Sequence, residues 1–308
     1  MAYTGELIAL ATVLCWTMSA QFFEAASRRV GATPVNIIRI FFALILFTLL
    51  LILRNGFLIP LHFSAHAWIY LGLSGVIGFF LGDIFLFKAL VEIGARVAML
   101  IFSLSAPTTA IIGWLFLDET YTLSQWFGMG VTLFGVGMVI LQKNPKPSAS
   151  SSLTVRNISF KGVLYGIGGM LGQALGYVLS KTGMKEGAEY LDAFSATQIR
   201  VIAAFVCFLI FFSVTGKWKN IGAALKDKKA IVLTAAGSIA GPFLGVSLSL
   251  MTLHYLTTGV ASTFLSLVPV FIIPFSIFLH KEHVSIRAGA GAVIAVFGIY
   301  LLMGHGLT

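Results

Sequence analysis

The chain has 308 residues, of which 58% are hydrophobic and only 10% are charged, and its mean hydropathy is +0.97. Soluble domains carry roughly a quarter charged residues, so this composition excludes a soluble protein and indicates an integral membrane protein. The 20 Lys and Arg outnumber the 11 Asp and Glu, but these charges lie between the apolar stretches, where they determine orientation in the membrane. We therefore expect membrane lipid and a small-molecule substrate as partners, and no nucleic acid.

Ten apolar stretches follow one another along the chain, each close to the roughly 20 residues that cross a bilayer as a helix. They cover residues 4–26, 34–53, 66–88, 94–117, 122–142, 162–181, 193–214, 229–253, 258–279 and 285–304. The first begins near Met1 without a basic flank or a cleavage site of small residues, so we expect a retained helix and not a signal peptide. The prediction is an all-α, multi-pass protein of the cell membrane (plasma or inner) with about ten transmembrane helices.

The second half of the sequence repeats the first half. At a constant offset of 163 residues, the segment 78–141 matches 241–304, and GFFLGDIFLFKAL recurs as GPFLGVSLSLMTL. Identical residues coincide at Gly78 and Gly241, Leu81 and Leu244, Gly82 and Gly245, Val97 and Val260, and Glu119 and Glu282. Further upstream, after a small change in length, Arg39 matches Arg200. A repeat this long and this apolar indicates a duplicated membrane unit.

The duplication predicts two copies of a five-helix unit, residues 1–142 and 161–308. Residues 143–160 between them are rich in Pro and Ser and are expected to form a linker. Because five is an odd number, the second copy must enter the membrane from the opposite side to the first. Two inverted five-helix repeats of this kind are the architecture of many secondary transporters.

Basic residues are concentrated in alternate connections between the expected helices. The first, third, fifth, seventh and ninth connections hold most of them, whereas the others hold only Arg54, Lys181 and Lys185. The positive-inside rule places the basic set in the cytoplasm and therefore both termini outside.

Residues 89–120, ALVEIGARVAMLIFSLSAPTTAIIGWLFLDET, and the glycines from Gly128 to Gly137 resemble the EamA-type permeases of the drug/metabolite transporter superfamily. The second copy carries a looser version of the same pattern, with Pro269 and Glu282. The resemblance implies two five-helix repeats and transport of solutes such as amino acids, metabolites, nucleotide sugars or drugs. Such relatives are usually drawn with both termini in the cytoplasm, opposite to the orientation that the charges predict, so orientation stays open.

Small residues recur at every fourth position in the third and eighth expected helices. The stripes are Ser74, Gly78 and Gly82 in one copy and Gly237, Gly241, Gly245 and Ser249 in the other. Such stripes let helix backbones approach closely within the membrane. Because the two stripes occupy matching places in the repeat, we expect the third and eighth helices to pack against each other.

Asp83 lies deep inside the third apolar stretch, and the second copy has Val246 at the matching position. Ionisable groups inside a membrane are costly and are therefore candidates for function. A carboxylate in apolar surroundings takes up a proton more readily than one in water, which suits a proton carrier. We expect Asp83 to line the substrate cavity and to couple transport to protons. The alternative is an ion pair or hydrogen bond between helices.

Polar residues spaced three or four apart share one face of the first and of the sixth expected helix. They are Thr17, Gln21, Glu24 and Arg28 on the first, and Gln173, Tyr177 and Lys181 on the sixth. An offset of 157 residues joins Gly5 to Gly162 and makes Trp16 correspond to Gln173 and Glu24 to Lys181. We expect Trp16, Thr17, Gln21, Gln173 and Tyr177 to line the substrate cavity.

Glu24 is the second coupling candidate. For Glu24 and Lys181 the alternative is that both side chains extend to the nearest membrane interface. His254 and Tyr255 end the eighth expected helix and are expected to border the cavity. Pro107 and Pro269 interrupt the fourth and ninth helices among serines, where a kink serves either as a gating hinge or as a static bend.

Three pairs of charged or polar residues are expected to have structural roles or none. Arg39 and Arg200, which match in the repeat, are predicted to serve the scaffold by pairing with carbonyls or lipid phosphate. Glu119 and Glu282 directly precede the fifth and tenth helices and are predicted to cap them. A further pair, His280 and His283, has no third ligand at a suitable spacing, so we expect neither a metal site nor a cofactor.

The inverted duplication favours a secondary active transporter that moves a small organic solute by alternating access, coupled to protons through Asp83 or Glu24. The solute would be an amino acid, a metabolite or a drug-like compound. A membrane-embedded enzyme and a passive channel are the alternatives. An enzyme is disfavoured because the sequence has no Ser-His-Asp set, no HExxH and no Gly-rich phosphate loop.

Overall fold

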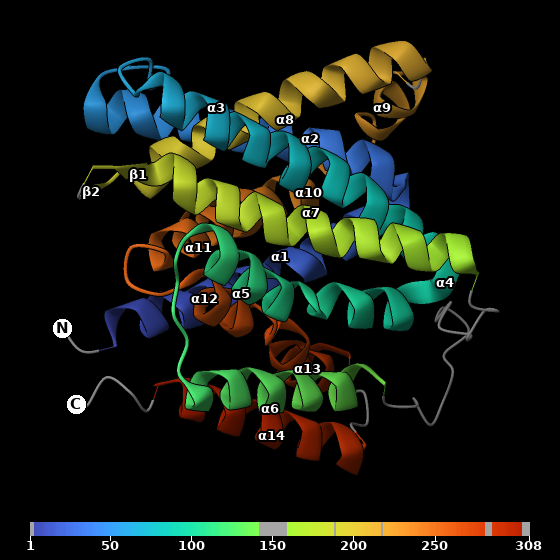
Figure 1. Ribbon diagram of the computed structural model, residues 1–308. Coiled ribbons are helices and arrows are strands. Elements are labelled where there is room, and N and C mark those ends of the chain that lie inside the picture. The colour runs from blue at the N-terminus through green and yellow to red at the C-terminus, as the bar shows by residue number, and fades with distance from the viewer. Residues whose placement is uncertain (1–2, 142–158, 188, 217, 281–284, 304–308) are drawn as a thin grey trace.

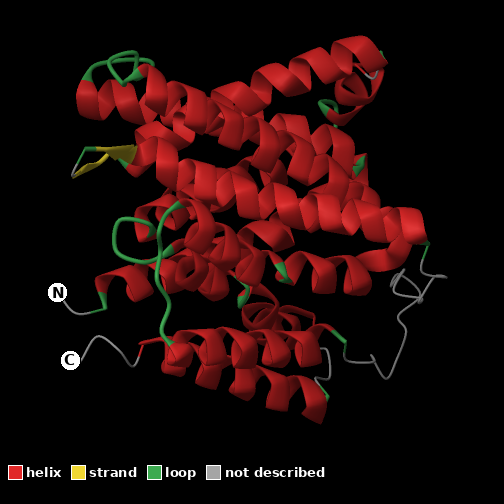
Figure 2. Ribbon diagram, in the orientation of Figure 1, coloured by secondary structure: helices red, strands yellow, loops and turns green. Residues whose placement is uncertain are grey.

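The computed structural model describes residues 3–141, 159–187, 189–216, 218–280 and 285–303. The predicted linker, apart from Ser159 and Phe160, lies outside these residues, as do Glu282 and His283. Almost every described residue is helical, and the helices lie side by side in a bundle (Figure 2). Apolar helices are the expected form in a bilayer because they satisfy all of their own backbone hydrogen bonds.

The first repeat consists of seven helical segments. They are α1 (Thr4–Val30), α2 (Ala32–Asn55), α3 (Ala65–Ser74), η1 (Gly75–Gly82), α4 (Asp83–Ser103), α5 (Ser105–Phe116) and α6 (Leu123–Ile140). Segment η1 is π-helical and runs without a break from α3 into α4. The α4 helix is kinked at Gly94, whose φ of 78° suits glycine. The kink separates the third expected span from the fourth.

The second repeat has the same plan with two small additions. Its elements are α7 (Phe160–Met184), β1 (Lys185–Glu186), β2 (Glu189–Tyr190), α8 (Ala193–Thr215), α9 (Trp218–Ala224), α10 (Lys228–Ser238), η2 (Ile239–Gly245), α11 (Val246–Thr252), α12 (Thr258–Leu265), α13 (Val268–His280) and α14 (Ile286–Met303). The β1–β2 hairpin and α9 were not predicted because each is too short for a sequence period.

The described chain has eight helical segments long and apolar enough to cross a membrane, together with a shorter apolar segment, Thr258–Pro274. The remaining expected span is the continuous run from α3 through η1 to the Gly94 kink in α4. The prediction of an all-α protein with about ten transmembrane helices in two inverted repeats is therefore confirmed. Helix α1 begins and α14 ends at one end of the bundle, whereas α6 ends and α7 begins at the other end (Figure 1).

The predicted contact between the third and eighth spans is wrong. In the described structure η1 packs against α7 and α8, and η2 packs against α1 and α2, so each small-residue stripe receives helices of the other repeat. A Cβ atom added at Gly176 of α7 would lie 2.9 Å from the Cα of Gly78, and one at Gly241 would collide with Ser19 Oγ of α1. The stripes admit a neighbouring backbone, as expected, but the neighbour is the first helix of the opposite copy.

Hydrogen bonds at these two interfaces follow the repeat. Ser74 Oγ donates to the Gly176 carbonyl at 2.6 Å, and Ser19 Oγ donates to the Gly237 carbonyl at 3.1 Å. Ser19 and Gly176 are equivalent at an offset of 157 residues, and Ser74 and Gly237 at 163. The donor serine of one interface therefore occupies the position that the acceptor glycine has in the other interface. The duplication therefore extends to the contacts that hold the two repeats together.

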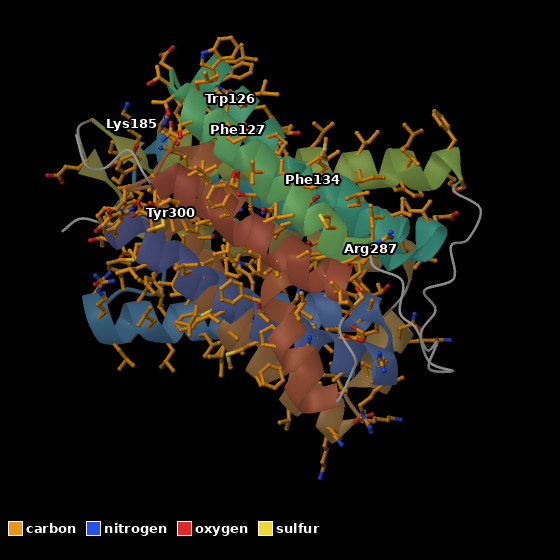
Figure 3. All side chains as sticks on the ribbon, turned by 90° about the horizontal axis from the view of Figure 1, so that it is seen from below. Trp126, Phe127, Phe134, Lys185, Arg287 and Tyr300 are labelled. Atoms are coloured by element: carbon orange, nitrogen blue, oxygen red, sulfur yellow. The ribbon has the colours of Figure 1, made fainter. Side chains whose placement is uncertain are left out.

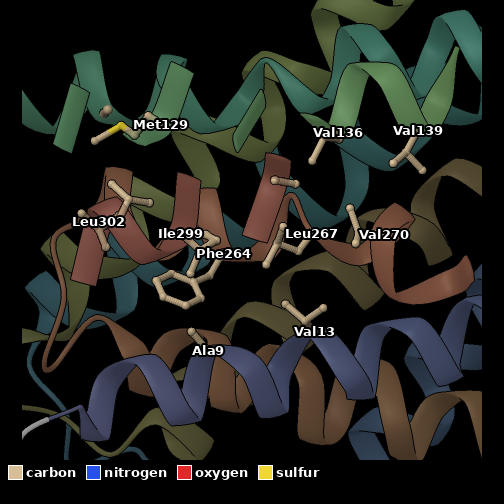
Figure 4. Packing of buried hydrophobic residues seen from close by; sticks show 13 residues of the cluster. Ala9, Val13, Met129, Val136, Val139, Phe264, Leu267, Val270, Ile299 and Leu302 are labelled. Carbon is tan, nitrogen blue, oxygen red and sulfur yellow. The ribbon is translucent and has the colours of Figure 1, made fainter. Parts of the chain in front are cut away.

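The last helices of the repeats, α6 and α14, pair along their length at the lower edge of Figure 1. Gly135 and Gly291 meet there, since a Cβ at Gly291 would lie 2.7 Å from the Gly135 carbonyl oxygen. Apolar side chains from this pair pack onto α1, α12 and α13 (Figure 4). Large apolar residues such as Phe127, Phe134 and Tyr300 are exposed on the outer face (Figure 3). This face suits contact with lipid tails.

We expect Gly241→Leu to destabilise the protein, because the new side chain collides with Ser19 and separates α1 from η2. Overpacking typically costs about 1–3 kcal/mol. Thermal unfolding of the detergent-purified protein measures the effect. Gly130→Leu is the matched control, since a Cβ at Gly130 meets no atom within 4 Å. Equal stability of the Gly241→Leu variant and the control would disprove the interface.

Candidate functional site

A central cavity of about 300 Å³ lies between the two repeats. Its walls come from α1, α2, η1, α4 and α5 of the first repeat and from α7, α8, η2, α11, α12 and α13 of the second. Three residues that the sequence analysis assigns to a substrate cavity line it, namely Trp16, Gln173 and Tyr177, and so does Pro269, which was expected to form a hinge or a bend. Most of the remaining lining is aromatic, aliphatic or hydroxyl-bearing, which is the usual composition of a site for a small organic molecule.

A larger vestibule of about 1120 Å³ lies at the end where α1 ends and α7 begins. It shares Ala20, Phe23, Arg39 and Phe87 with the central cavity. These four residues therefore stand where the vestibule meets the cavity.

Asp83 lines the cavity and forms an ion pair with Arg39, whose guanidinium donates to Asp83 Oδ2. Arg39 also donates from Nε to Asn36 Oδ1 at 2.7 Å, and its guanidinium lies over the ring of Phe23. Asp83 thus forms the ion pair between helices that the sequence analysis gave as the alternative to proton coupling. The prediction that Arg39 pairs with carbonyls or lipid phosphate is wrong, because the third span brings Asp83 within reach.

Arg200 on α8 lines the same cavity but has no carboxylate partner among the described residues. Only 5% of this residue is exposed, and its Nε has no hydrogen-bond partner there. Its guanidinium lies 4.5 Å from the centre of the Phe79 ring. The scaffold role predicted for Arg200 is therefore not supported by any ion pair or hydrogen bond in the described chain.

Tyr177 is tied into the cavity wall. Its hydroxyl donates to the Ser249 carbonyl at 2.6 Å and lies 3.0 Å from Thr252 Oγ1. This contact joins α7 to α11, the first and third spans of the second repeat. Tyr177 therefore shapes the cavity with its ring, while its hydroxyl is already engaged.

Five residues predicted for the cavity or its hinge do not line it in the described structure: Thr17, Gln21, Pro107, His254 and Tyr255. Thr17 is fully buried, and its hydroxyl donates to the Val13 carbonyl. It lies about 100° from Trp16 around the helix, so the two side chains are on different faces. His254 stacks on Tyr190 of the hairpin, and 56% of Tyr255 is exposed. Spacing alone did not separate the cavity face from its neighbours.

Glu24 lines the vestibule rather than the central cavity and pairs with Arg28 one turn further along α1. The two side chains are 55% and 63% exposed. An exposed pair at this spacing contributes little to stability, roughly 0.3–0.5 kcal/mol. The alternative that Glu24 extends toward the interface describes its position better than a place in the cavity.

The end of the bundle opposite the vestibule holds a buried network around Glu119. Its carboxylate accepts from Lys181 Nζ at 2.8 Å, from Tyr121 Oη at 2.5 Å, and from the Thr258 backbone N–H at 2.9 Å. Lys181 also donates to the Leu256 carbonyl. Glu119 therefore caps α12, which begins at Thr258, and the prediction that it caps the fifth helix is wrong. Thr122 caps that helix instead.

Burial alone would raise the pKa of the Glu119 carboxyl, but the Lys181 ammonium and the hydroxyls of Thr258 and Tyr121 hold its pKa below its usual range. The stabilisation from this network is complete above the ordinary Glu pKa of about 4.3 and is lost as pH falls through the lower folded value. Glu119 therefore stays charged near neutral pH.

Several cavity residues were missed by reasoning from the sequence. Phe79, Phe102, Ser262 and Ser266 line the cavity, yet apolar and small residues of this kind occur throughout membrane helices. Two of them carried a signal, because Phe79 directly follows Gly78 in the small-residue stripe and Ser266 matches Ser103 in the repeat. In the described residues no group of three or more His, Cys, Asp or Glu could hold a metal ion.

The model of the EamA-like transporter family matches residues 3–141 and again residues 160–304. The chain belongs to this family. An EamA-like protein is a membrane transporter of the drug/metabolite transporter superfamily, so the resemblance found in the sequence is confirmed. The family's members are transporters and not enzymes.

A solved structure titled "Crystal structure of protein" is similar to this EamA-like chain in fold. It covers 97% of this chain and 97% of its own, with a TM-score of 0.71 at 13% sequence identity. At this identity the similarity concerns the fold alone. The comparison with curated proteins found no match.

Proposed function

We propose that the protein is a secondary active transporter that carries a small organic solute across the cell membrane by alternating access. The observation that carries the proposal is the cavity between the repeats, which meets a wide vestibule at one end. At the other end the Glu119–Lys181 network joins the loop between α5 and α6 to α7 and α12. These two features support a solute site with one open and one closed side.

The inverted symmetry supports the step in which the cavity closes to the vestibule and opens at the opposite end. The interface of η1 with α7 and that of η2 with α1 use equivalent residues with their roles exchanged. Because the repeats are inverted, an exchange of conformation between them would close the vestibule and open the opposite end. Two nearly equivalent packings of one chain are what alternating access requires.

Proton coupling is proposed for Asp83. Arg39 faces it from α2, and the other ionisable side chains that line the same cavity are Arg200 on α8 and Tyr177 on α7. In the described conformation the Arg39 guanidinium stabilises the charged carboxylate. A conformation that separates the pair would favour protonation of Asp83. During the cycle, Asp83 would alternate between an ion pair with Arg39 and a protonated, neutral form.

Counterflow in proteoliposomes tests the transport proposal. Vesicles loaded with one unlabelled solute should transiently accumulate the same labelled solute, and a panel of amino acids, organic acids and amines identifies it. A passive channel gives flux without counterflow, whereas a membrane enzyme releases a chemically changed product. Either outcome would contradict a carrier.

A further inference from the structure

We propose that Arg200 is the binding residue for the carboxylate of the transported solute, so that the substrate class is a small organic acid with an apolar body. This inference rests on the proposed transport function. It begins from the contrast between two arginines that occupy equivalent places in the repeats and line one cavity. Arg39 is neutralised by a carboxylate, whereas Arg200 forms no ion pair within the described part of the chain.

The loss of partners around Arg200 is traceable residue by residue. Around Arg39, the partners are Asp83 and Asn36. At the matching positions the second repeat has Val246, which lines the cavity, and Thr197, whose hydroxyl donates to the Ala193 carbonyl. The second repeat therefore keeps the guanidinium but holds neither acceptor for it.

An unpaired guanidinium is expensive where Arg200 lies. The residue is 95% buried, since 5% of it is exposed, and its Nε has no hydrogen-bond partner in the described chain. Buried charges are normally paired, because taking an ion out of water costs several kcal/mol. A cavity residue kept charged without a partner is therefore arranged for an anion that comes and goes.

The surroundings determine how an anion would approach. Phe79 covers one face of the guanidinium at 4.5 Å, which orients its plane. The Nη2 atom lies beside Gly78, since a Cβ added to that glycine would lie 3.5 Å from it. The N–H edge of an arginine binds a planar carboxylate with two parallel hydrogen bonds.

The charge and size of the cavity define the rest of the solute. Arg39, Arg200 and Asp83 leave it one positive charge in excess, which favours a monoanion and opposes an organic cation. A phosphate monoester carries close to two negative charges at neutral pH, more than one free guanidinium neutralises. The volume of about 300 Å³ and the aromatic lining, including Trp16 and Phe102, suit a small apolar or aromatic body.

Ligand-dependent thermal stability of the purified protein tests the assignment without requiring transport. The probes are benzoate, phenylacetate and indole-3-acetate, each compared with its uncharged amide and with phenethylamine as a cation. We expect at least one carboxylate to raise the unfolding midpoint in a saturable manner, and the matched amide to bind at least ten-fold more weakly. Equal effects of acids and amides, or preference for the amine, would overturn the assignment.

Two variants identify the residue. Arg200→Gln should weaken binding of the carboxylate at least ten-fold, whereas Arg54→Gln, which removes an exposed arginine paired with Asp192, should leave it unchanged. Val246→Asp recreates the acid of the first repeat and should abolish carboxylate binding while Arg200 is still present. If the Arg200→Gln variant does not fold, the Val246→Asp variant tests the role of Arg200 instead. Undiminished carboxylate binding by the Val246→Asp variant would show that Arg200 is not the site.

The outcomes separate this inference from the proposed function. If counterflow occurs with neutral or cationic solutes and carboxylates do not compete, the transporter stands and the organic-acid assignment fails. If carboxylates bind through Arg200 but no solute shows counterflow, the site stands and secondary transport fails.

Discussion

Asp83→Asn is expected to reduce uptake driven by a pH gradient at least ten-fold while solute exchange without a gradient continues. Asparagine keeps the shape of the side chain and imitates its protonated form, and Arg39 retains Asn36 as an acceptor. The variant can neither release a proton nor pair with Arg39 as an ion. Transport would then lose its link to the proton gradient.

Proteoliposomes with an imposed pH gradient measure this effect, with counterflow in the same preparation as the reference. Asp118→Asn is the matched control, because Asp118 lies in the loop between α5 and α6 and does not line the cavity. Undiminished gradient-driven uptake by the Asp83→Asn variant would reduce Asp83 to a packing role. Glu24 in the vestibule would then be the next candidate.

Lys181→Met is expected to destabilise the protein by about 3–5 kcal/mol at pH 7, because it leaves the buried Glu119 carboxylate without its cation. Only 13% of the Lys181 side chain and 6% of the Glu119 side chain are exposed, so solvent screens the loss little. The closed end of the bundle should also open more often. Thermal unfolding measures the first effect.

The pH dependence of this variant has a definite sign. Without Lys181, burial raises the Glu119 pKa, so the variant is penalised while the carboxylate is charged and relieved when it is protonated. The difference from the unchanged protein should therefore be largest near neutral pH and shrink below about pH 4. Lys181→Met combined with Glu119→Gln should recover much of the stability. A loss independent of pH in the single variant would contradict the ion-pair account.

The sequence predicted the helices and the duplication because both depend on local composition and on identity at a constant offset. It predicted close packing at Gly78 and Gly241, since a small-residue stripe shows that a backbone approaches. It could not predict which helix approaches each stripe. In the structure, α7 approaches Gly78 and α1 approaches Gly241. A stripe carries no record of its partner helix.

The candidate site was predicted only in part for a similar reason. Asp83, Gln173 and Tyr177 were predicted because polar or asymmetric positions stand out in an apolar chain, and Trp16 was predicted because it corresponds to Gln173 in the repeat. The roles of Arg200 and Glu119 depended on contacts across long stretches of sequence, to the cavity and to α12. The replacement of Asp83 by Val246 was visible in the sequence, but its consequence for Arg200 needed the geometry.

The central claim is that one cavity opens alternately to the two sides of the membrane. A single cysteine at Ser266, which lines the cavity, reports this when the native Cys15 and Cys207 are replaced by alanine. In sealed vesicles, a membrane-impermeant thiol reagent should label it from both faces, and Lys181→Met should increase labelling from the face opposite the vestibule. Labelling from one face only, in both backgrounds, would contradict alternating access.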